Sequence, residues 1–169
     1  MRGMKNILLC LTVATLTVLS ASADKPALEK PAEEVAVLSI HETKAVFKGL
    51  VYRRCMGRTS RCPERCGDSG EYAQFEITEY TKYEKEGKYG DPKQTTYLIQ
   101  VSDFDKKPLD KDNNGNDLTV LGKVIKDLKP GDQVELSWQH QYITATSQNG
   151  GKSKFPRRVV VKLEKLERG

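Results

Sequence analysis

The chain has 169 residues, of which 37% are hydrophobic and 30% are charged, and its formal net charge is +5. This length suits a single domain with a real core, and no segment after the N-terminal stretch approaches the ~20 apolar residues that span a membrane. The charge is too small for a dedicated nucleic-acid-binding protein, which usually shows a dense basic stripe.

The N-terminal stretch has the pattern of a secretory signal. Arg2 and Lys5 precede an apolar run over residues 7–19, and small residues follow up to Ala23. A basic start, an apolar centre and an A-x-A end are the features of a cleavable signal peptide. We therefore predict that residues 1–23 are removed and that the protein is secreted or periplasmic. Cleavage also removes Cys10, which leaves three cysteines.

Residues 24–42 are expected to form a linker or N-terminal extension. The stretch from 24 to 34 is polar, contains Pro26 and Pro31 and shows no periodicity, which suits a tether. We assign residues 43–169 to one folded domain. Residues 35–40 offer a further strand, so a six-stranded barrel or sandwich is the alternative architecture.

Alternation of apolar and polar residues predicts three strands in the first half of the domain. It runs over residues 47–52, 72–80 and 95–102, and a period of two indicates half-buried antiparallel strands. Gly49 interrupts the first of these strands, where a bulge would let it bend around a barrel. The charged segment 82–93, which contains glycines and a proline, is expected to be a solvent loop.

One helix and two strands are predicted in the second half. Apolar residues recur at helical spacing after Asp117, which is well placed to cap the first turn. These residues are Leu118, Leu121, Ile125 and Leu128. Alternation resumes over residues 133–144 and 158–166, and the even-numbered face of the first of these strands is expected to be buried.

The predicted element order is β-β-β-α-β-β. Over residues 43–166 it resembles the OB-fold, a five-stranded and partly open Greek-key barrel. Two local runs also resemble ones common in that fold, Phe47-Lys48-Gly49-Leu50-Val51 and Leu128-Lys129-Pro130-Gly131-Asp132-Gln133-Val134. The resemblance implies a mainly β protein, built as a small OB-like barrel with a ligand face bordered by loops.

Cys55, Cys62 and Cys66 lie together in the predicted connection between the first two strands. In an oxidising compartment, two of them would form a disulfide that pins the loop. The third thiol would then be buried or would join a second chain as a homodimer.

The alternative interpretation of these cysteines is a thiolate metal site. Three cysteines and a histidine form a known zinc set, and thiolates also prefer Cu(I). The candidates for a fourth ligand are His41, His140 and Asp68. In an OB-like barrel His140 would lie about 25 Å from the cysteines, at about 3.3 Å per residue, so a polar core position is its favoured role.

Five arginines surround the cysteines and give the segment a positive potential, which stabilises thiolates and pairs with anions. They are Arg53, Arg54, Arg58, Arg61 and Arg65. A phosphate, sulfate or carboxylate is therefore a candidate ligand, and a solvated basic loop is the alternative. The absence of C-x-x-C spacing disfavours a thiol oxidoreductase.

Residues 110–115 match the first half of a calcium-binding loop. Asp110, Asp112 and Asn114 alternate before a glycine, as oxygen ligands do in the pattern D-x-D-x-N-G. Leu121 stands where the bidentate glutamate should be, and no preceding helix is predicted. An ordinary Asn/Gly turn that ends in a helix cap is the alternative.

Asp68-Ser69-Gly70 matches the D-[ST]-G triplet of aspartic proteases, whose two aspartates share a proton. A single copy would require a homodimer. The chain has no other catalytic motif, and its two histidines nominate no Ser/His/Asp set.

The second predicted strand offers a candidate binding face of tyrosine, amide and hydroxyl groups, which can stack on sugars or bases. Its residues are Tyr72, Gln74, Thr78 and Tyr80. Glu76 and Glu79 would repel phosphates, so an extracellular glycan, peptide or protein is favoured over nucleic acid as the partner.

The sequence thus favours an exported, non-catalytic binding or adaptor module whose first loop is organised by cysteines. A second hypothesis is a zinc, copper or thiol protein centred on Cys55, Cys62 and Cys66. A third is a small secreted hydrolase that uses Asp68.

Overall fold

The computed structural model describes residues 33–57, 59–147 and 149–167. The predicted signal peptide, Cys10, residues 24–32 of the predicted linker and Arg58 lie outside the described residues. Export to the periplasm or the medium therefore stays a prediction.

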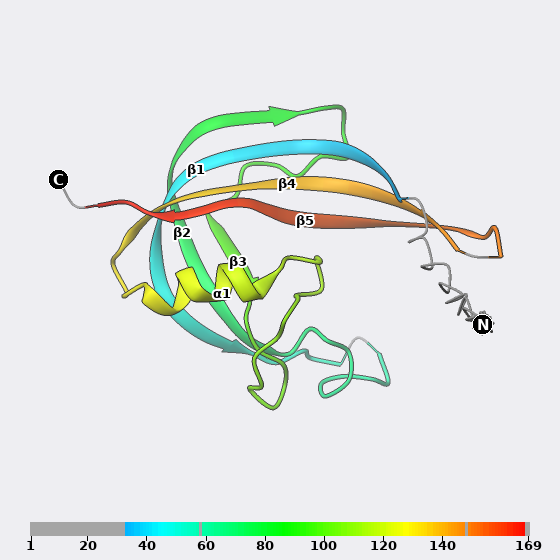
Figure 1. The fold of residues 1–169 in the computed structure, drawn as a ribbon, viewed down its shortest axis with the longest axis horizontal. Helices are drawn as coiled ribbons and strands as arrows, with labels where there is room; N and C mark the ends of the chain where they lie inside the picture. The colour runs from blue at the N-terminus through cyan, green and yellow to red at the C-terminus, as the bar shows by residue number, and fades with distance from the viewer. Residues whose placement is uncertain (1–32, 58, 148, 168–169) are drawn as a thin grey trace, which may run out of the picture. The chain divides into compact units, whose positions relative to one another are not determined.

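Five antiparallel strands and one helix make up the fold, which confirms the mainly β class and the predicted element order. They are β1 (Glu33–Arg53), β2 (Gly70–Lys85), β3 (Thr96–Gln100), α1 (Leu118–Asp127), β4 (Gln133–Thr146) and β5 (Lys152–Lys165). The strands lie in the order β3-β2-β1-β4-β5 (Figure 1). Since β4 returns to lie beside β1 after three consecutive strands, the connection is a Greek key, as in an OB-like barrel.

The sheet starts ten residues earlier than the predicted domain boundary at residue 43, because β1 begins at Glu33. Residues 33–42, assigned to a linker from the sequence, pair with the second half of β4 in a register that joins Glu33 to Ala145. β2 likewise continues to Lys85, so the expected solvent loop begins later than predicted. The extended β1 pairs with β4 over residues 33–46 and with the extended β2 over residues 39–53.

β-Bulges bend β1 and β2. The register between them shifts between Phe47 and Gly49, where a bulge was predicted, and the glycine takes a φ of 112° that other residues rarely adopt. A further shift leaves Thr78 as an extra residue in β2. Each extra residue exchanges the two faces of a strand for every residue that follows it.

The core lies on the inner face of this curved sheet, under α1. Its centre is Trp138, which is fully buried and stacks on His41 with ring centroids 4.4 Å apart. Tyr97 lies against the same indole ring at 4.4 Å. The predicted buried face of β4 is confirmed from Val134 to His140, whereas Tyr142 is 39% exposed.

Asparagine side chains of the segment before α1 bond to the free side of the edge strand β5. Within the described residues β3 does not pair with β5. Instead, Asn114 Oδ1 accepts a hydrogen bond from Arg158 N at 3.2 Å, and Asn116 Oδ1 accepts one from Val160 N at 2.7 Å. We call Asn114, Asn116 and the β5 groups they contact the asparagine seam. It replaces part of the ladder that would complete a barrel.

The helix α1 begins where the sequence predicted. The side chain of Asp117 accepts a hydrogen bond from Thr119 N at 2.9 Å, which satisfies one of the amides left unpaired at a helix start. Leu118 and Ile125 are buried in the core. The helix thereby covers the inner face of the sheet.

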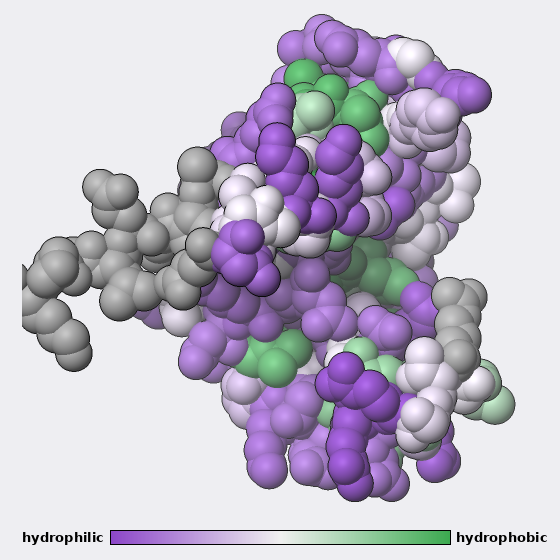
Figure 2. Space-filling view, turned by 90° about the vertical axis from the view of Figure 1, so that its right-hand side faces the viewer, coloured by the Kyte–Doolittle hydropathy of each residue, from purple (hydrophilic) through white to green (hydrophobic). Residues whose placement is uncertain are grey.

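The described surface is largely hydrophilic. On the side drawn in Figure 2, hydrophobic residues show only as separate patches between hydrophilic ones. Over the part of the chain that the structure describes, the search for a helix of membrane-spanning length and hydropathy finds none.

Candidate metal centre

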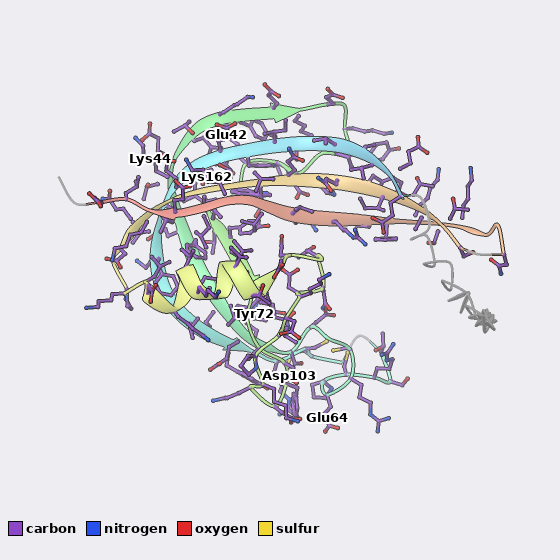
Figure 3. All side chains as sticks on the ribbon, in the orientation of Figure 1. Glu42, Lys44, Glu64, Tyr72, Asp103 and Lys162 are labelled. Carbon is purple, nitrogen blue, oxygen red and sulfur yellow. The ribbon has the colours of Figure 1, made fainter. Side chains whose placement is uncertain are left out.

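The cysteines lie in the loop that joins β1 to β2. In Figure 3, Tyr72 near the start of β2 and Glu64 in this loop lie in the lower part of the view, whereas Glu42, Lys44 and Lys162 lie on the upper part of the curved sheet. The loop therefore stands apart from the main core, in the place predicted for it.

The three sulfur atoms converge. The Sγ atoms of Cys55, Cys62 and Cys66 all lie within 4.8 Å of one another, and each residue is half-buried. Cys55 Sγ and Cys62 Sγ are 2.9 Å apart. A disulfide requires about 2.05 Å, so the expected bridge is not formed between these two sulfurs.

Local hydrogen bonds fold the loop around Cys62. Its amide donates to Thr59 O at 3.1 Å, and the Thr59 hydroxyl lies 3.5 Å from Cys62 Sγ. Arg65 N donates to Arg61 O at 2.8 Å and tightens the turn that leads to Cys66. Hydrogen bonds from Cys55 first, and then from Thr59, lower the pKa of the Cys62 thiol to about 6.

Buried polar groups hold the second half of the loop. Ser69 is 2% exposed, and its hydroxyl accepts from Cys55 N at 3.0 Å and donates to Pro63 O at 2.7 Å. Gln100 Nε2 donates to the carbonyls of Gly67 and Ser69, at 3.0 and 3.2 Å. Together these bonds fix the main chain on both sides of the cysteine cluster.

Gln100→Ala is expected to release this half of the loop. Gln100 is 5% exposed, and its amide also donates to Ser102 O at 3.1 Å. Each such bond contributes about 0.5–1.5 kcal/mol, so amide hydrogen exchange over residues 67–70 should become at least about tenfold faster. Gln74→Ala, on the neighbouring strand, is the matched control and should leave these rates unchanged. Equal rates in both variants would contradict this anchoring role.

The candidate fourth ligands from the sequence lie elsewhere. His41 is 0% exposed within the core, and His140 pairs in register with Ser39, far along β1 from the cysteines. His140 is thus the polar core residue that the sequence favoured. Asp68 is in the loop, but its Oδ1 accepts a hydrogen bond from Asn113 Nδ2 at 3.3 Å, and it does not belong to the cysteine group.

Asp68 is exposed, and its backbone carbonyl accepts a hydrogen bond from Tyr72. The hydrolase hypothesis needs a second aspartate from another chain, so it stays a prediction.

Two of the predicted arginines lie beside Cys55. Arg53, Arg54 and Cys55 line a pocket of about 450 Å³ together with Met56, Asp68 and Tyr72. The guanidinium of Arg53 lies over the Tyr72 ring at 5.9 Å from its centroid. Arg61 and Arg65 are exposed on the turn. Two of the described arginines, Arg53 and Arg54, thus lie beside Cys55 at this pocket. The anion site predicted from the arginines stays a prediction.

The predicted binding face on β2 is not continuous. Tyr72 and Gln74 share the outer face, and Thr78 is the exposed bulge residue. Tyr80 lies on the opposite, core-facing side, with its ring centroid 6.4 Å from that of Trp138. The bulge explains the difference, because the sequence alternation was counted through it without the extra residue.

The calcium candidates serve the turn instead. Asp112 Oδ1 accepts from the amides of Asn114 and Asn116, and its Oδ2 accepts from Asn116 Nδ2. Asn114 Oδ1 is used in the asparagine seam. These oxygens are engaged with N–H donors, and Asp110 is not drawn into a ligand group with them in the described chain. The contacts favour the Asn/Gly turn that was the alternative.

Several residues of the site were not singled out from the sequence, namely Ser69, Gln100, Asn113 and Met56. Hydrogen bonds between distant parts of the chain place the first three, and no local pattern announces such bonds. The sequence shows that Met56 directly follows Cys55 but not that its side chain is 90% exposed. The cysteine spacing C-x6-C-x3-C is likewise not a familiar motif. Function has to be inferred from the geometry itself, because the chain matches no protein-family model, no curated protein and no solved structure in the comparisons made.

Proposed function

We propose that Cys55, Cys62 and Cys66 form a thiolate centre that binds one soft metal ion, so that the protein is a metal-binding module. The observation that carries the proposal is the convergence of three Sγ atoms within 4.8 Å. Three thiolates on one ion at about 2.3 Å lie about 3.8 Å apart. Cys55 Sγ and Cys62 Sγ need to separate by about 0.9 Å to reach it.

Three sulfurs favour a metal centre over a single disulfide. A disulfide between Cys55 and Cys62 would use two of the three sulfurs and would not explain why Cys66 Sγ lies next to them. Hydrogen bonds of Ser69, within the loop, and of Gln100, on β3, also hold the main chain of the loop. Its fold therefore does not depend on a disulfide.

The ligand set selects a soft cation. Thiolates prefer Cu(I) and Zn(II) to the hard ions that oxygen ligands hold. Binding takes all three cysteines as thiolates, which leaves the centre with net negative charge. The bordering arginines, Arg53 and Arg54, offset that charge.

This proposal keeps the predicted class of a non-catalytic binding module with a cysteine-organised loop. It replaces an extended glycan or peptide as the first ligand to test. Two of the four residues predicted for that face, Tyr72 and Gln74, lie together on the outer surface of β2, whereas Tyr80 belongs to the core side.

Anaerobic titration of the reduced protein with Cu(I) and with Zn(II), against a chromogenic chelator, tests the proposal. We expect one ion per chain, and each of Cys55→Ser, Cys62→Ser and Cys66→Ser should lower the affinity at least about 100-fold, because each removes a direct ligand. Ser60→Ala, at an exposed position of the same loop, is the control and should bind as the unaltered protein does.

Alkylation followed by intact-mass measurement supplies a second readout. All three cysteines should be protected when metal is bound and should react when it is removed. Stoichiometric binding that survives in all three serine variants would overturn the proposal. So would a protein that, isolated without reductant, holds a Cys55–Cys62 disulfide and does not bind metal after reduction.

A further inference from the structure

Met56 is the most exposed large apolar residue in the described chain, at 90%. It directly follows Cys55, and both residues line the pocket that Arg53 and Arg54 border. A methionine side chain this exposed contributes no hydrophobic free energy to folding. Single exposed apolar residues are common on protein surfaces. Its place beside Cys55, one of the three converging cysteines, suggests a chemical role for its own sulfur.

The cysteine triad needs one more ligand for four-coordination. Among the residues described here, the histidines are in the core, and the Asp68 carboxylate accepts a hydrogen bond from Asn113. Met56 is the residue next to Cys55 and lines the same pocket. Its thioether stands on an unbranched side chain with several rotatable bonds, so it can adopt many positions. The neighbouring Gly57 has a φ of 80°, so the chain turns directly after Met56 in a conformation that other residues rarely adopt.

We propose that Met56 is the fourth ligand of the centre and makes it selective for Cu(I) over Zn(II). This inference rests on the thiolate centre proposed above. A thioether is a soft, neutral donor that binds Cu(I) well, whereas four-coordinate zinc takes thiolate, imidazole or carboxylate ligands. A neutral fourth donor also adds no charge to a centre that the three thiolates already make negative.

Met56→Leu tests the assignment because leucine keeps the size and the apolar character but removes the sulfur. Cu(I) affinity, measured anaerobically by chelator competition on the full chain, should fall about 10-fold to 100-fold, while Zn(II) affinity should change less than about threefold. Val120→Ala changes an exposed apolar residue on α1, away from the cysteines, and is the control, with both affinities unchanged.

X-ray absorption at the selenium edge of selenomethionine-labelled, Cu(I)-loaded protein provides a direct readout. A copper–selenium distance should be present in the unaltered chain and absent from Met56→Leu. Unchanged Cu(I) affinity together with a missing copper–selenium distance would overturn the role of Met56 while leaving the cysteine centre intact. An equal loss of Cu(I) and Zn(II) affinity would also overturn it, since that points to a disturbed loop. Loss of all binding in the unaltered protein would remove the thiolate centre and this inference together.

Discussion

Asn116→Ala is expected to lower the free energy of unfolding by about 3 kcal/mol, because it opens the asparagine seam. Asn116 is 3% exposed, and its amide donates to Asp112 Oδ2 and to Arg158 O while accepting from Val160 N. Alanine leaves these partly buried partners without a hydrogen bond, and each such group costs about 1–3 kcal/mol. Urea unfolding, followed by the fluorescence of the single tryptophan, Trp138, measures the change.

Asn114→Ala is the graded control for this experiment. It removes the hydrogen bond to Arg158 N, together with a less buried side chain, so a loss of about 1 kcal/mol is expected. Equal losses in the two variants would contradict the seam as described, because the contacts of Asn116 are the more numerous and the more buried.

Acid is expected to unfold the protein through His41. Burial in the core lowers the pKa of His41 from 6.5 to about 4, and the positive charges of His140 and Arg158 act in the same direction against the opposing effect of Asp91. The ring is enclosed by aromatic and polar side chains from several strands. Those in contact with it are Ser39, Tyr80, Tyr83 and Trp138.

The sign of the effect follows from the direction of the shift. Between pH 6.5 and 4 the unfolded chain binds a proton at His41 that the folded chain does not, so stability is full above pH 6.5 and decreases as the pH falls through this window. The loss at pH 4 amounts to about 3 kcal/mol. The pKa of His140 is also lowered by burial, which adds to the same trend.

Comparison with His41→Gln isolates this contribution. Glutamine keeps hydrogen-bonding capacity in the core but does not titrate. The difference in unfolding free energy between the two proteins should therefore shrink by about 3 kcal/mol when the pH is lowered from 7 to 4. Parallel pH curves for the two proteins would contradict the assignment.

The sequence was a good guide to elements whose signal is local. The helix start at Asp117, the bulge at Gly49 and the buried face of β4 each follow from a short pattern, and the structure has all three. The resemblance to the OB-fold also implied that the fourth strand lies antiparallel beside the first, and β4 does lie beside β1.

Features set by pairing between distant residues were not predictable. Residues 33–42 were assigned to a linker, with a separate strand over 35–40 as the alternative, because nothing in them shows that they continue β1 and have β4 as a partner. The extra residue at Thr78 is set by the partner strand, so counting by twos placed Tyr80 on the wrong face. The acidic and amide residues of the turn before α1 match a calcium loop in sequence because the same side chains can serve either an ion or a turn.

The candidate site was predictable in its residues but not in its geometry. Three cysteines within one loop already suggested either a bridge or a metal. Only the fold places Cys62 and Cys66 next to Cys55, since Ser69 and Gln100 hold the two ends of the loop. The role of Met56 depends on its exposure, which the sequence does not reveal.

The asparagine seam has a consequence for how molecules of this protein meet. An uncovered edge strand offers its free amides to the strand of another chain, and such pairing starts aggregation. Along β5 the amides of Arg158 and Val160 are already taken by asparagine oxygens. The side chains that hold the barrel together therefore also keep the middle of its exposed edge from serving as a template for a second copy.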